Sequence, residues 1–147
     1  MDPQGRYPTI DGVSCDSLEH TDFHIHAHLV IRVSGESQVV PEGIGIHDTC
    51  LYWLHTHRAS GIIHVEAPAD AQVTLGTFFD IWGQPLSATQ VAGWPAGPEA
   101  SVFVFVNGEG YTGDPRMIRL KDLENIELQV GPAPLEPLPY EFSPDFR

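Results

Sequence analysis

The alternation of residues 23–33 constrains the fold more than any other stretch of the chain, and it reads Phe-His-Ile-His-Ala-His-Leu-Val-Ile-Arg-Val. Successive side chains of a β-strand point to opposite faces of a sheet. One face of this segment is unbroken and apolar, and it comprises Phe23, Ile25, Ala27, Leu29, Ile31 and Val33. His24, His26 and His28 project together from the other face. The pattern predicts a long strand that buries one face and carries histidines on the other.

The other apolar runs are short and are bounded by Gly, Pro and Asn, which is typical of strands. We expect further strands at residues 38–40, 51–55, 62–66, 102–106 and 125–130. Asn107-Gly108 predicts a hairpin turn after one of them. Residues 1–20 and 84–100, which contain several Gly and Pro, are expected to be irregular.

One helix is expected, over residues 75–82. Its apolar stripe at i, i+3, i+4 and i+7 is formed by Leu75, Phe78, Phe79 and Trp82. Thr74 is a suitable residue to cap its start, and Gly83 to end it. A helix this short must pack against a sheet to be stable.

These segments predict a mostly-β fold, a small β-sandwich or barrel with one short helix packed on it. A length of 147 residues suits a single His-rich β domain spanning residues 1–147, and 41% hydrophobic residues can supply its core. Residues 132–147 contain five prolines, so this Pro-rich tail is expected to run extended over the surface.

Charge excludes two classes of partner. The formal net charge is -13, and only 7 Lys and Arg residues are present. We therefore expect no nucleic-acid partner and no attraction to an anionic membrane surface. No segment approaches the roughly 20 apolar residues of a transmembrane helix, so membrane insertion of this segment is not expected.

Six of the eight histidines fall in positions that favour metal binding, namely His24, His26, His28, His55, His57 and His64. Imidazole is the commonest metal ligand, and ligands on strands hold their geometry well. Gly61 could begin a turn that returns His64 beside the two other blocks. An all-imidazole set suits zinc, copper, nickel or iron, and of these we expect a copper or zinc ion as the cofactor.

Neighbouring residues refine this set. Three histidines in a row on one strand seldom all reach one ion, so one of the first block is expected to lie outside the site. Asp22 and Glu66 flank the histidine blocks as possible residues of the second coordination sphere. Glu66 shares a strand face with His64 and could be a metal ligand or an acceptor for an imidazole N–H, and both residues could instead be surface carboxylates. His20 and His47 lack a histidine neighbour at strand spacing and are expected to be ordinary packed residues.

Several functions remain open at this point. A coordinatively filled site would make this a transition-metal-binding protein. Three histidines and an open position would make it a mononuclear metalloenzyme, an oxidoreductase or a hydrolase. The histidines could also form a solvated sheet face together with Arg32, or a pH sensor. A metal-free alternative is an extracytoplasmic interaction module with Trp53, Trp82 and Trp94 as exposed anchors.

The two cysteines, Cys15 and Cys50, flank the first histidine block. A disulfide between them is favoured and would suit an extracytoplasmic setting. Two buried thiols are the alternative. Thiolate ligation of a metal is less favoured, because neither residue has a partner at zinc-finger spacing.

Two resemblances bear on these patterns. Residues 23–28 resemble the copper-ligand strand of copper/zinc superoxide dismutase, although that family's downstream zinc loop has no counterpart here, and we assign no dismutase activity. The wider pattern FHIHAHL, WLHTH and GIIHVE resembles a family of uncharacterised bacterial and archaeal proteins, often secreted or membrane-anchored. This second resemblance spans most of residues 10–85 and implies an extracytoplasmic location.

Overall fold

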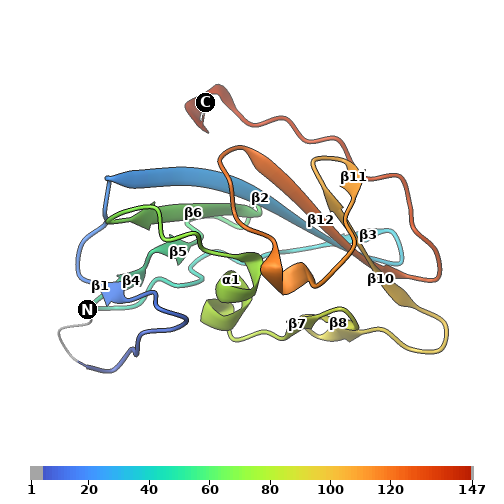
Figure 1. Cartoon of the computed structure of the whole chain (residues 1–147), viewed down its shortest axis with the longest axis horizontal. Helices are drawn as coiled ribbons and strands as arrows, with labels where there is room; N and C mark the ends of the chain where they lie inside the picture. The colour runs from blue at the N-terminus through green and yellow to red at the C-terminus, as the bar shows by residue number, and fades with distance from the viewer. Residues whose placement is uncertain (1–4, 147) are drawn as a thin grey trace.

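The computed structural model describes residues 5–146, and its centre is a seven-stranded sheet. The strand order is β11 (Glu109–Gly110), β10 (Ser101–Val106), β12 (Glu124–Gly131), β2 (Phe23–Val33), β6 (Ile62–Ala67) and β5 (Leu54–His55), with β3 (Glu36–Gln38) also paired to β2. β12 runs parallel to β2, and the other pairs are antiparallel. The predicted strand at residues 23–33 is confirmed, and it lies between β12 and β6 (Figure 1).

The predicted helix is confirmed as α1 (Leu75–Trp82). The Thr74 hydroxyl accepts a hydrogen bond from the Thr77 backbone N–H at 3.3 Å, and Gly83 ends the helix in the left-handed conformation. These are the caps that helix ends require, because their terminal backbone groups lack partners within the helix. Phe78 and Phe79 are fully buried, so α1 packs its apolar stripe on one side of the sheet (Figure 1).

The core forms between α1 and the apolar face of the sheet. The inward residues of β2 are buried as predicted, and they are Ile25, Ala27, Leu29 and Ile31. Ile63 and Val65 from β6 and Leu128 from β12 join them in one cluster with the helix. The prediction of a mostly-β fold with one short helix is confirmed, and the main sheet does not close into a barrel within residues 5–146.

The expectation that residues 84–100 are irregular was wrong. They form a three-stranded antiparallel sheet of β7 (Leu86–Ser87), β8 (Gln90–Val91) and β9 (Trp94–Pro95). Strands of two residues are too short to show any alternation, and the Gly and Pro residues between them dominate the local pattern. A short 3-10 helix, η1 (Pro115–Met117), follows β11.

Residues 1–20 were also expected to be irregular, but β1 (Cys15–Asp16) pairs with β4 (Leu51–Tyr52). Trp53 interrupts the predicted strand at residues 51–55, which is divided into β4 and β5. The partner strand predicted at residues 38–40 instead occupies residues 36–38 as β3. Residues 1–4, a part of the predicted irregular segment, lie outside the described residues.

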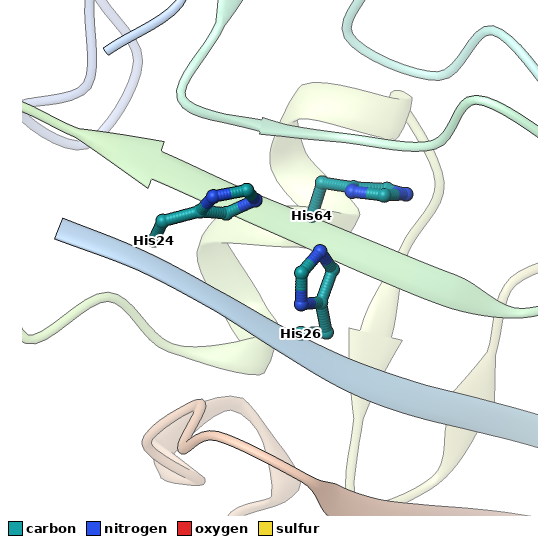
Figure 2. A group of neighbouring side chains, drawn as sticks. All are labelled: His24, His26 and His64. Carbon is teal, nitrogen blue, oxygen red and sulfur yellow. The ribbon is translucent and has the colours of Figure 1, made fainter. Parts of the chain in front are cut away.

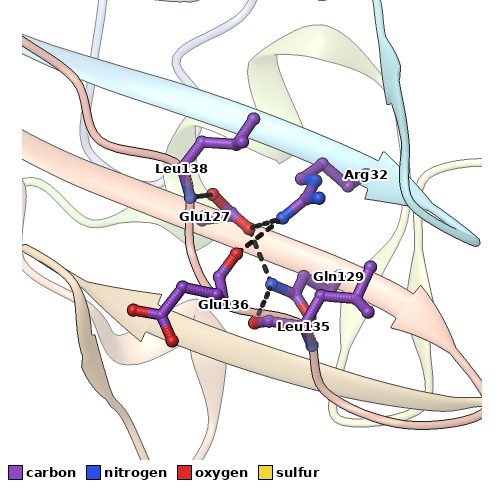
Figure 3. A network of polar contacts seen from close by, with 6 residues as sticks. All are labelled: Arg32, Glu127, Gln129, Leu135, Glu136 and Leu138. Carbon is purple, nitrogen blue, oxygen red and sulfur yellow. Dashed lines mark hydrogen bonds and ion pairs between the residues drawn. The ribbon is translucent and has the colours of Figure 1, made fainter.

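The Pro-rich tail crosses the face of the sheet opposite α1, as Figure 1 shows. The Gln129 side chain donates to the Leu135 carbonyl at 3.0 Å and accepts from the Leu135 N–H at 2.9 Å. Glu127 accepts from the Leu138 N–H at 2.8 Å (Figure 3). The tail is extended, as predicted, and it ends in a 3-10 turn, η2 (Pro144–Phe146).

Arg32 lies beneath this tail. Its guanidinium donates to the Glu127 carboxylate at 2.9 Å and to the Glu136 carbonyl at 3.1 Å (Figure 3). Only 9% of Arg32 is exposed. The alternative of a solvated sheet face is therefore wrong at this position, because the tail removes the face from water and supplies it with polar partners.

Among the described residues, no helix has the length and apolar character needed to cross a membrane.

Candidate metal centre

Five of the six predicted ligands converge at one end of the polar face, where β2, β6 and β5 lie side by side. Register explains the convergence. On β2 and β6, His26 lies opposite His64 and His24 lies opposite Glu66. On β6 and β5, His64 lies opposite His55. Side chains opposite one another in paired strands share a face and have Cβ atoms about 4.5–5.5 Å apart.

The first group of candidate ligands is the triad His24, His26 and His64, which we call the imidazole triad. Their rings approach one another from two neighbouring strands (Figure 2). The ring centroid of His26 lies 4.6 Å from that of His24 and 4.7 Å from that of His64. Candidate ligand atoms of all three lie within 4.8 Å of one another, so the triad could hold a metal ion.

The second group contains Glu19, His55, His57 and Glu66, which we call the mixed group. Glu66 Oε1 lies 2.9 Å from His55 Nε2 and 3.8 Å from His57 Nε2. Glu19 Oε1 lies 3.8 Å from His57 Nε2 on the exposed side. The mixed group could also hold a metal ion, and it adjoins the triad, because the rings of His57 and His64 are 4.6 Å apart.

Two glycines allow the backbone to approach closely enough to place these side chains. Gly61 has a φ of +81°, and a Cβ there would lie 2.4 Å from the Leu29 carbonyl oxygen. Gly45 has a φ of +77°, and a Cβ there would lie 2.4 Å from the Leu54 carbonyl oxygen. Gly61 thus begins the turn into β6 and His64, and Gly45 supports the strand that carries His55.

Electrostatics favours the neutral form of two triad members, His26 and His64. Burial, followed by the nearby rings of His26, His57 and His55, lowers the pKa of His64 to about 3. Burial and the adjacent His24 likewise lower the pKa of His26. A neutral imidazole has a free lone pair, which is the form that binds a metal ion.

The mixed group contains a carboxylate at its buried end. Burial alone would raise the pKa of Glu66, but the hydrogen bond with Glu19 and the neighbouring His55 lower it. That hydrogen bond is also the main cause of the raised pKa of Glu19, to which burial adds. Burial lowers the pKa of His55. The buried pair is thus an imidazole beside a carboxylate, and both groups are competent metal ligands.

His28 and Asp22 belong to neither group. The His28 ring hydrogen-bonds Asn125 through Nδ1 at 2.8 Å and the Ser60 carbonyl through Nε2 at 3.2 Å. Tyr140 from the tail stacks on that ring, with centroids 3.5 Å apart. Asp22 is exposed.

The two isolated histidines, His20 and His47, belong to neither group. His20 hydrogen-bonds Asp16 through Nε2 at 2.7 Å, and His47 stacks on Tyr7 with centroids 4.0 Å apart. Both thus have a packing role of the kind expected for a histidine without a histidine neighbour.

Glu19 is the site residue that sequence reasoning missed. It lies in the exposed loop after β1, which has no pattern of its own. The predicted disulfide is confirmed, since Cys15 is bonded to Cys50, and thiolate ligation of a metal is thereby ruled out. The disulfide could have revealed Glu19, because it joins residues just before Glu19 to the strand that leads into His55.

A pocket of about 560 Å³ opens beside the two groups, and it is lined by residues that include His57, His64, Arg58, Ser60, Tyr140 and Phe146. The Phe146 ring lies 4.7 Å from the His26 ring, so the end of the tail covers one side of the triad. Three tryptophans were considered as exposed anchors, namely Trp53, Trp82 and Trp94. All three are partly buried and pack against the core.

Comparisons with protein-family models, with curated proteins and with solved structures find no match to this chain. The fold and the site's geometry are therefore the basis for inferring its function.

Proposed function

We propose that this protein binds a transition-metal ion, copper or zinc, through the histidines of the sheet's polar face. The observation that carries this proposal is the imidazole triad, in which His26 and His64 lie opposite one another on paired strands and His24 adjoins them. Three imidazoles on rigid strands form a preorganised nitrogen site. Such a set favours copper and zinc over calcium or magnesium, which prefer oxygen ligands.

A metal-handling role and a catalytic role differ in whether the ion keeps an open coordination position. The pocket beside His57 and His64 favours an open position, because a small ligand could reach an ion held there. A mononuclear metalloenzyme is therefore the second candidate. Binding of azide to the Cu(II)-loaded protein tests it, since a shift in the visible and EPR spectra requires an accessible copper position.

The disulfide is compatible with an extracytoplasmic domain. We further propose that the protein acts outside the cytoplasm, as the resemblance to secreted and membrane-anchored His-rich proteins implies. Fractionation of the native organism, followed by alkylation of free thiols in each fraction, tests this location. A cytoplasmic protein with reduced cysteines would contradict it.

Calorimetric titration of the chelator-treated, untagged protein tests metal binding. We expect saturable binding of Cu(II) or Zn(II) tighter than about 1 μM, an affinity of about 8 kcal/mol. His26→Ala should weaken it at least about tenfold, because one of three imidazoles is lost. His47→Ala is the matched control, since His47 lies outside both groups, and it should bind as the wild type does. Absence of saturable binding of either metal would contradict the proposal.

A further inference from the structure

The mixed group has a feature that the imidazole triad lacks, a buried contact between an imidazole nitrogen and a carboxylate oxygen. His55 Nδ1 lies 2.7 Å from the Tyr52 carbonyl oxygen, which can only accept, so Nδ1 carries a ring proton. The other ring nitrogen, Nε2, faces Glu66 Oε1 at 2.9 Å. A carboxylate oxygen is an acceptor, so either a proton or a metal ion must lie between these two atoms.

Burial makes this requirement strong. His55 is completely buried and Glu66 is 4% exposed. Water does not reach the two atoms, so the proton or metal ion between them is their only partner at this contact, and buried polar groups without a suitable partner are costly. The backbone holds the pair in place, because the Glu66 N–H donates to the Trp53 carbonyl at 2.8 Å.

The distances in the mixed group match those in a metal's coordination shell. Ligand atoms about 2.0–2.1 Å from a tetrahedral ion lie roughly 3.3 Å from one another. The contacts from Glu66 Oε1 to His55 Nε2 and His57 Nε2 are 2.9 Å and 3.8 Å. The contact from Glu19 Oε1 to His57 Nε2 is 3.8 Å. These values lie on both sides of the expected edge length, and all four candidate ligand atoms lie within 4.8 Å of one another.

The two groups also differ in charge. The triad provides three imidazole rings and no carboxyl group, whereas the mixed group provides two carboxyl groups, from Glu19 and Glu66, together with two imidazole rings. Two carboxylates neutralise a divalent cation, which lowers the cost of placing it at a partly buried position. A set of histidine and glutamate ligands is typical of zinc.

We propose that the mixed group is a second metal site, so that the centre holds two ions side by side. This inference rests on the proposed function of the triad. His64 lies at the junction, because its ring contacts the His26 ring of the triad and its Nδ1 lies 3.9 Å from Glu66 Oε1 of the mixed group. The second ion takes its ligands from the exposed loop before β2, from β5 and the loop after it, and from β6.

The test is the zinc stoichiometry of the chelator-treated full-length chain, measured by elemental analysis after desalting and by calorimetry. We expect two equivalents of zinc for the wild type and for His47→Ala. His26→Ala should lose one equivalent and keep the other. Glu19→Gln, at a half-exposed position where folding is little affected, should weaken the other equivalent at least about tenfold and spare the first.

The outcomes separate this inference from the proposed function. One equivalent in the wild type, weakened equally by His26→Ala and Glu19→Gln, would mean a single shared ion and would overturn the second site alone. One equivalent that is weakened by His26→Ala and unaffected by Glu19→Gln or Glu66→Gln would likewise leave the mixed group metal-free, with a proton between His55 and Glu66. Absence of zinc and copper binding from every variant would overturn both. Circular dichroism of each variant confirms that it is folded.

Discussion

At the scale of single residues, the site depends on which face of the sheet each side chain occupies, because side chains alternate between the two faces along a strand. His24, His26, His64 and Glu66 share one face because β2 and β6 pair with His26 opposite His64. A slip of one residue would turn these side chains into the apolar core and expose Ile25 and Val65, which are now buried. The hydrophobic effect on one face therefore fixes the positions of the histidines on the other.

The low pKa of His64 predicts a stability that depends on pH. Burial and neighbouring imidazoles lower this pKa to about 3, whereas the ordinary value is 6.5. As the pH falls below about 6.5, the unfolded chain takes up the proton before the folded protein does. The free energy of unfolding of the metal-free protein should therefore decrease steadily between about pH 6.5 and pH 3. Urea denaturation at pH 7 and pH 4.5 measures this change.

His64→Gln is the control for that prediction, because glutamine does not titrate. Its unfolding free energy should decrease less steeply over the same pH interval. Identical pH dependence in the wild type and in His64→Gln would show that His64 does not contribute.

Gly61 provides a second residue-scale prediction. Gly61→Ala introduces a Cβ 2.4 Å from the Leu29 carbonyl and places alanine at φ +81°. The cost should be about 1–3 kcal/mol or more in unfolding free energy, and metal binding should weaken because His64 follows this turn. Gly108→Ala has the same φ but no atom within 4 Å of the added Cβ, so it should cost less and leave metal binding unchanged. Equal effects of the two substitutions would contradict the role of the close approach.

At the scale of elements, two connections hold segments around the sheet. The disulfide ties β1 to the segment before β4, and thereby holds the loop with Glu19 over the mixed group. On the same face, Arg32, Glu127 and Gln129 bind the tail backbone. Both connections are formed by residues far apart in sequence.

Removal of the disulfide should destabilise the fold. The double variant Cys15→Ser and Cys50→Ser opens a loop that spans 35 residues. In the chain-entropy model this costs about 3–4 kcal/mol of unfolding free energy. Urea denaturation of the variant and the oxidised wild type measures the difference. A variant as stable as the wild type would mean that β1 is held by its other contacts.

Removal of the buried ion pair should release the tail. Arg32→Met leaves Glu127 buried without its cation, which typically costs about 3–5 kcal/mol. Arg119→Met is the matched control, because its pair with Asp70 is 44% exposed on both sides and such pairs contribute at most about 1 kcal/mol. Limited proteolysis should cleave the tail of Arg32→Met faster than that of the wild type. Equal cleavage rates in the two proteins would show that the ion pair between Arg32 and Glu127 does not hold the tail on the sheet.

At the scale of the whole molecule, the sequence predicts the elements better than it predicts their long-range connections. The strand at residues 23–33 and helix α1 each carry a complete local signal, in alternation and in caps. The position of Glu19 beside His57 and the hydrogen bond between Glu127 and Leu138 have no such local signal, because each joins residues that are distant in sequence. The pairing of β7, β8 and β9 also has no signal in the sequence, because a strand of two residues is too short to show an alternation of apolar and polar side chains. Metal-binding histidines could be proposed from spacing, but their division into two groups required the register of three strands.

The whole chain is strongly acidic, with a net charge of -13, and this charge attracts cations toward the protein surface. At the centre described here, imidazoles and two carboxyl groups lie together at one end of the sheet's polar face. The overall field thus favours the same class of ligand as the local geometry does.

An anomalous difference map from crystals of the zinc-loaded protein, collected on both sides of the zinc absorption edge, would locate a metal ion in the triad. We expect a peak about 2.0–2.1 Å from nitrogen atoms of His24, His26 and His64. Peaks confined to His20 or His47, or the absence of any peak at the triad in protein that has taken up zinc, would contradict this expectation.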